Sequence, residues 1–65
     1  MGREESSLTA KDRRLIEEAY AFTDYTRWGY VEHLAKEADT EEARRILHSR
    51  ASSLYHTDEY YADMI

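Results

Sequence analysis

Apolar residues recur at helical spacing along most of this chain, in three stretches that each follow a helix-start signal. In the first stretch, the spacing i, i+3, i+4, i+7 of a single buried face is met by Leu15, Ile16, Ala19, Phe22, Thr23 and Thr26. Thr9 precedes this stretch as an N-cap, and Asp12 stands three residues later, as in a capping box. The pattern predicts a helix over residues 10–23.

The second stretch predicts a helix over residues 27–38. Its buried face would carry Val31, Leu34, Ala35 and Ala38. Asp24 and Thr26 are both suitable N-caps for the element that follows them. Gly29 disfavours a helix interior by about 1 kcal/mol relative to Ala, so a helical Gly29 would indicate close approach of a neighbouring group. Alternatively, the helix begins at Tyr30 and Gly29 belongs to the turn.

The third stretch has the clearest start signal. Asp39 is a candidate N-cap, and Glu41 and Glu42 follow in the first turn, where the helix dipole favours acidic residues. Its apolar face continues to the last residue, through Ala43, Ile46, Leu47, Ala51, Leu54, Tyr61, Ala62 and Ile65, and is interrupted only at Arg50 and Asp58. The stretch predicts one helix of about 25 residues, or a helix that breaks near His56 and is followed by a short helical turn.

The three predicted lengths do not match. At 1.5 Å per residue, the first two helices span about 21 Å and 18 Å, whereas an unbroken third helix spans about 38 Å. The overhang would expose an apolar and aromatic surface that a monomer rarely leaves uncovered. We therefore predict an all-α fold, a small three-helix domain with a long third helix, which forms a homodimer.

Composition supports a partner requirement. A chain of 65 residues forms one small core of marginal stability, and because it has no Cys, neither a disulfide nor a Cys-based zinc site can stabilise it. Residues 1–8 show no periodicity and predict a flexible arm, with a single domain over 9–65. No apolar run resembles a signal peptide or a membrane span, so we expect a cytoplasmic protein with no membrane partner. Gly2 and Ser6 meet a bare myristoylation pattern, but Glu4 and Glu5 are a poor setting for membrane attachment.

Aromatic residues are abundant, with six Tyr, one Trp and one Phe. Tyr and Trp are enriched in protein interfaces because they combine a large rigid surface with a polar group. The candidate interface residues are Trp28, Tyr30, Leu54, Tyr55, Tyr60, Tyr61, Met64 and Ile65. Trp28 could equally belong to the core, which needs large side chains. After Arg50 the charged residues are all acidic, which suits a basic or aromatic-accepting partner surface.

Catalytic and cofactor signals are weak. His33 and Glu37 stand at i, i+4, but no paired metal-ligand spacing supports a metal site, and no catalytic motif is present. We therefore expect no enzyme activity and no cofactor.

Two function classes remain. The first is a noncatalytic protein-interaction module, a regulator of the inhibitor or adaptor type, acting as a homodimer that docks on a larger protein. Small acidic helical proteins of this type include virus-encoded inhibitors and antitoxin-like proteins, a comparison by type that assigns no residue. The alternative is a helix-turn-helix DNA-binding regulator that uses Arg44, Arg45 and Arg50. The net charge of −5 and the acidic start of the third helix disfavour binding to nucleic acid.

Overall fold

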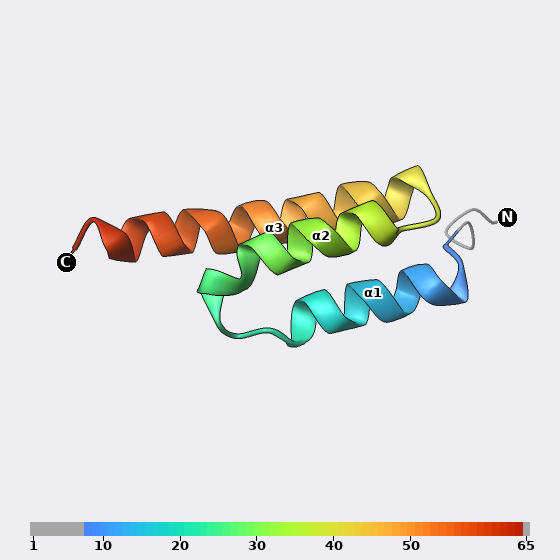
Figure 1. Cartoon of the computed structure of the whole chain (residues 1–65), viewed down its shortest axis with the longest axis horizontal. Coiled ribbons are helices and arrows are strands. Elements are labelled where there is room, and N and C mark those ends of the chain that lie inside the picture. The colour runs from blue at the N-terminus through green and yellow to red at the C-terminus, as the bar shows by residue number, and fades with distance from the viewer. Residues whose placement is uncertain (1–7, 65) are drawn as a thin grey trace, which may run out of the picture.

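The computed structural model describes residues 8–64, and its regular elements are all helical. They are α1 (Ala10–Ala21), the 3-10 turn η2 (Tyr25–Arg27), α2 (Trp28–Glu37) and α3 (Glu41–Ala62). Figure 1 shows that α1 and α3 run in the same direction and α2 runs opposite to both, while α3 continues past its neighbours to the C-terminus. The all-α fold with a long third helix is confirmed. The expected arm falls mostly outside the described residues, and Leu8 packs against the core.

The predicted capping box at the start of α1 is confirmed. The Asp12 amide donates to Thr9 Oγ1 over 3.0 Å, and the Thr9 amide donates back to the Asp12 carboxylate over 3.4 Å. The helix ends at Ala21, two residues earlier than predicted, because Phe22 adopts an extended conformation. Arg50 of α3 reaches across and donates to the carbonyls of Ala19 and Phe22, so a charged group from another helix completes the C-terminal end of α1.

The connection between α1 and α2 is partly helical. Asp24 acts as the expected cap, accepting from the amide and hydroxyl of Thr26, and opens the 3-10 turn. Gly29 lies inside α2 and not in a turn. No neighbouring group approaches it, since nothing lies within 4 Å of the position that a Cβ would take. The prediction that a helical Gly29 serves a close approach is therefore wrong.

The start of α3 differs from the prediction by one residue. Thr40 is the N-cap, and its hydroxyl accepts from the Ala43 amide over 3.2 Å. Asp39 instead turns its carboxylate towards α1, where it accepts from the Thr9 hydroxyl over 2.9 Å. The acidic first turn at Glu41 and Glu42 is as predicted.

The open question of a break near His56 is resolved in favour of one continuous α3. Two groups that might have capped a new helix have other partners. The Thr57 hydroxyl donates to the Ser53 carbonyl one turn back, and the Asp58 carboxylate accepts from the Trp28 indole. Both side chains are thus engaged along an unbroken helix, which continues to Ala62.

The core is small. Among the described residues nine hydrophobic side chains are buried, and five of them are alanines, which leaves few large side chains inside. They are Ala19, Val31, Leu34, Ala35, Ala38, Ala43, Leu47, Ala51 and Leu54. The Cα radius of gyration is 13.1 Å, compared with about 11 Å for a compact domain of this length. The molecule measures 48 × 19 × 17 Å and is therefore elongated. Within residues 8–64, no helix has the length and apolar character needed to cross a bilayer.

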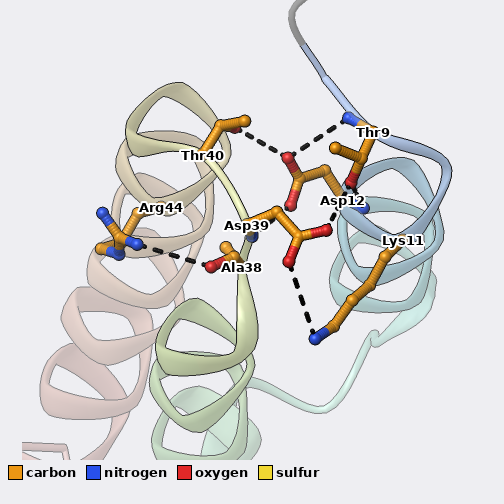
Figure 2. Close-up of polar contacts among 7 residues, drawn as sticks. All are labelled: Thr9, Lys11, Asp12, Ala38, Asp39, Thr40 and Arg44. Atoms are coloured by element: carbon orange, nitrogen blue, oxygen red, sulfur yellow. Dashed lines mark hydrogen bonds and ion pairs between the residues drawn. The ribbon is translucent and has the colours of Figure 1, made fainter.

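A polar cluster of Thr9, Lys11, Asp12, Asp39 and Thr40 joins the start of α1 to the α2–α3 connection (Figure 2). Asp12 is fully buried and accepts from the Asp39 amide and the Thr40 hydroxyl, each over 2.7 Å. Burial raises the pKa of Asp12, but these bonds and those from Thr9 outweigh it and hold the pKa below its ordinary value. The helices α1 and α3 both begin here, and their positive dipole ends favour a carboxylate.

Candidate interaction surface

The predicted length mismatch is present but smaller than expected. At 1.5 Å per residue, the 22 residues of α3 span about 33 Å, against about 18 Å for the 12 of α1 and 15 Å for the 10 of α2. The turn η2 precedes α2 and extends the segment that packs against α3. Part of the α3 overhang is therefore covered by the same chain. What remains is the C-terminal part of α3, visible in red in Figure 1.

The covering is made by an aromatic cluster of Tyr25, Trp28, Tyr55 and Tyr61. The rings of Tyr25 and Tyr61 stack with centroids 5.2 Å apart, and those of Trp28 and Tyr55 meet edge to face at 5.0 Å. The Trp28 indole donates to Asp58 Oδ2 over 3.1 Å. Asp58, the acidic residue that interrupts the apolar face of α3, is therefore the hydrogen-bond acceptor of the only Trp of the sequence. Trp28 is half-buried, so it is in part a core residue.

The last part of the chain presents a C-terminal surface made of Tyr55, Tyr60, Tyr61 and Met64, which shares Tyr55 and Tyr61 with the aromatic cluster. Their exposed fractions are 41%, 62%, 46% and 66%. Leu54, which the sequence placed on the exposed overhang, is instead buried at 6% and belongs to the core. Ile65 lies outside the described residues. Four of the candidate interface positions are thus exposed near the C-terminal end of α3, three of them on the helix and Met64 just after it.

The charge of this end is uniform. Asp58, Glu59 and Asp63 are the charged residues after Arg50, and the last turn of α3 contains no basic residue. Acidic groups at a helix C-terminus meet the negative end of the helix dipole, which is unfavourable. A basic group from another molecule would reduce both the repulsion among these acidic residues and their repulsion from the negative end of the helix dipole.

Tyr30 lies apart from this surface and interacts within the chain. Its hydroxyl donates to Glu18 over 2.7 Å, and its ring meets Phe22 edge to face at 5.4 Å. The hydrogen bond to Glu18, together with burial and the carboxylate charge, raises the pKa of Tyr30. The contacts of Tyr30 join α1 to α2, while its side chain remains 40% exposed.

The three arginines of the DNA-binding alternative do not form one free patch. Arg50 is bound to α1 carbonyls and lies over the Tyr20 ring at 5.0 Å, and Arg44 donates to the Ala38 carbonyl over 3.4 Å. Arg45 alone is exposed. In addition, α2 and α3 lie side by side and antiparallel (Figure 1), whereas the helices of a helix-turn-helix cross at about 90–120°.

Metal ligands are scattered over the described part of the chain. The nitrogen of His33 lies 3.9 Å from the Glu37 carboxylate, at the i, i+4 spacing noted in the sequence, and both side chains are exposed. No group of three His, Asp or Glu side chains between residues 8 and 64 is placed to hold a metal ion.

The sequence did not reveal the long-range partners of Asp12, Arg50 and Asp58. Each bonds a residue 27 to 31 positions away, so local spacing carried no signal of the pairing. For Arg50 and Asp58, the available signal was that both interrupt an otherwise apolar helix face. In the comparisons with known proteins, no family model, curated protein or solved structure matches this chain.

Proposed function

We propose that this chain is a noncatalytic protein-interaction module, a regulator of the inhibitor or adaptor type, that docks on a larger protein through its C-terminal surface. The observation that carries the proposal is the exposure of Tyr60 and Met64 at 62% and 66%, on a helix end whose charges are all acidic. Exposed Tyr rings supply contact area together with a hydrogen-bonding group, as interface residues do. The acidic residues favour a basic partner surface.

The polar side chains that bond between helices support a noncatalytic role. Asp12 and Thr9 hold the ends of α1 and α3 together, and Arg50 completes the C-terminal end of α1. These groups are engaged in holding helix ends together. The DNA-binding alternative receives less support, since Arg50 and Arg44 are engaged within the fold.

Affinity capture from the cell that makes this protein tests the proposal. The bait is the full chain, compared with a Tyr60→Ser/Met64→Ser double variant and with Tyr20→Ser as a control. Tyr20 is exposed at 56% but lies on α1, outside the C-terminal surface. We expect a protein that binds the wild type and the control, is lost with the double variant, and binds more weakly as salt is added.

Two results would contradict the proposal. One is a binding protein retained equally by the double variant, which would move the docking site elsewhere. The other is the absence of any specifically bound protein. Circular dichroism of each variant at the capture temperature would verify that loss of binding does not reflect unfolding.

A further inference from the structure

The three helices are not held together equally. Of the nine buried hydrophobic side chains among the described residues, eight belong to α2, α3 and the connection between them, and α1 supplies only Ala19. Ala has a small side chain, so its burial removes little apolar surface from water. The larger apolar residues Leu15 and Ile16 of α1 are half-buried. Burial of apolar surface therefore fixes α1 less firmly than it fixes α2 and α3.

The hairpin of η2, α2 and α3 has contacts of its own that do not involve α1. Tyr25 stacks on Tyr61, and Trp28 meets Tyr55 edge to face. The Trp28 indole also donates to Asp58 over 3.1 Å. The connection between α2 and α3 is short, which keeps the two helices side by side. All of these contacts can remain in place when α1 moves away.

A charged group ties each end of α1 to this hairpin. At the start of α1, Asp12 accepts from an amide and a hydroxyl of the α2–α3 connection, each over 2.7 Å. At its end, Arg50 of α3 donates to two backbone carbonyls, over 3.3 and 2.8 Å. Between the two ties, the Tyr30 hydroxyl donates to Glu18 at an exposed position. Water replaces the partners of such groups when they separate, so their net contribution to holding α1 is modest.

The segment between α1 and η2 is suited to act as a hinge. Phe22 and Asp24 both have extended backbone conformations, and in Figure 1 this segment joins α1 to η2 without helical structure. Hinges are short connecting segments whose backbone dihedral angles absorb the motion of the elements that they join. A change of dihedral angles within residues 22–24 would therefore move α1 and leave the hairpin unchanged.

We propose that α1 opens as a unit about this hinge, while the hairpin of η2, α2 and α3 stays folded. The ties at Asp12 and Arg50 are both released in the open form. Opening uncovers Ile46, which lies one turn before Arg50 on the flank of α3 that α1 covers. The same flank continues along α3 to the exposed Tyr60, with Met64 just after the helix.

Opening therefore lengthens the surface that is available to the larger protein of the proposed function. This consequence rests on the proposed function, whereas the opening itself does not.

Hydrogen exchange distinguishes the opening of α1 from unfolding of the whole chain. A helix of 12 residues is marginal when it is alone in water, so the α1 amides exchange once α1 has separated. The amides in the middle of α3, from Leu47 to Leu54, exchange only when the hairpin unfolds as well. We expect the amides from Leu15 to Ala19 to have protection factors at least about tenfold lower than those of the α3 amides.

Urea separates the two processes further. Protection of the α1 amides should fall less steeply with added urea, because opening exposes less surface than complete unfolding does. Equal protection factors and equal urea slopes in α1 and α3 would overturn the proposal, since α1 would then separate only in the unfolded chain.

Two substitutions supply a matched pair of variants, measured where exchange reports the opening equilibrium. Asp58→Ala removes the bond to Trp28, which the closed and open forms share and the unfolded chain does not have. This variant should lower the protection of the α3 amides about fivefold and leave that of the α1 amides unchanged. Arg50→Met keeps the aliphatic stem and removes a tie that only the closed form has. It should therefore lower the protection of both sets of amides by the same factor.

An equal loss of protection in α1 and α3 for Asp58→Ala would also overturn the proposal, because both helices would then exchange through the same unfolded state. These measurements use the protein without a partner. Absence of a captured protein would contradict the proposed function and leave the opening of α1 supported, so the two failures are distinguishable.

Discussion

The end of the bundle where α1 and α3 begin and the end where α3 stops are held by different kinds of interaction. At the first end, a buried carboxylate accepts hydrogen bonds from two segments that are far apart in the sequence. At the other end, aromatic rings pair across η2, α2 and α3 while remaining partly exposed. The first end satisfies its polar groups internally, whereas the second leaves part of its aromatic surface exposed. Buried polar closure thus holds one end of the bundle, and partly exposed ring packing holds the other.

The largest expected effect is at the polar cluster. Asp12→Ala removes the acceptor of the Asp39 amide and of the Thr40 hydroxyl, leaving partly buried donors without this partner. We expect a loss of about 2–3 kcal/mol in the free energy of unfolding, since hydrogen bonds to a charged group are the strong ones. Urea unfolding followed by circular dichroism measures this loss.

Asp39→Ala is the matched control for that change. Its carboxylate belongs to the same cluster but is 43% exposed, and its ion pair with Lys11 is long at 3.9 Å. We expect a loss below about 1 kcal/mol. Equal losses for the two variants would show that burial of Asp12 does not distinguish the two carboxylates.

Acid should open the same end before the other. The folded pKa of Asp12 lies below 3.8, its value in an unfolded chain, so its charge stabilises the fold above pH 3.8. That stabilisation is lost as the pH falls below 3.8 towards the folded value. Asp12→Asn should therefore reduce stability at neutral pH and flatten the pH dependence in this window. A variant whose acid unfolding curve keeps the slope of the wild type would assign the dependence to other carboxylates.

The elements could be predicted from the sequence because helix periodicity and capping are local. The capping box at Thr9 and the acidic turn at Glu41 depend on neighbours within one turn, and both are present as predicted. The partners of Arg50 and Asp58 could not be predicted, since they depend on how α1 and α2 lie against α3. The surface was predicted in part. The exposed end at Tyr60 follows from the length of α3, whereas burial of Leu54 follows from the cover that η2 and α2 supply.

At the aromatic end, a smaller effect is expected from the bond between Trp28 and Asp58. Asp58→Ala leaves the half-buried indole N–H without its acceptor, and we expect a loss of about 1 kcal/mol. Asp58→Asn retains a carbonyl oxygen as acceptor and should lose less. Because the chain has one Trp, its fluorescence reports this end alone, and a red shift is expected for Asp58→Ala. An unchanged emission and stability would mean that ring packing alone holds Trp28.

The smallest expected effect has the opposite sign and also lies at the aromatic end. Gly29 is helical, exposed and free of neighbours within 4 Å of an added Cβ, so Ala fits there without displacing any group. Gly29→Ala should stabilise the fold by about 0.5 kcal/mol, because it restricts the unfolded chain and favours the helix. Thermal unfolding should show a rise of about 2–4 °C. A fall would mean that α2 begins at Tyr30, with Gly29 in a turn that Ala does not tolerate. Trp28 would then lie before α2, and the helix would not fix the position from which Trp28 contacts Tyr55 and Asp58 of α3.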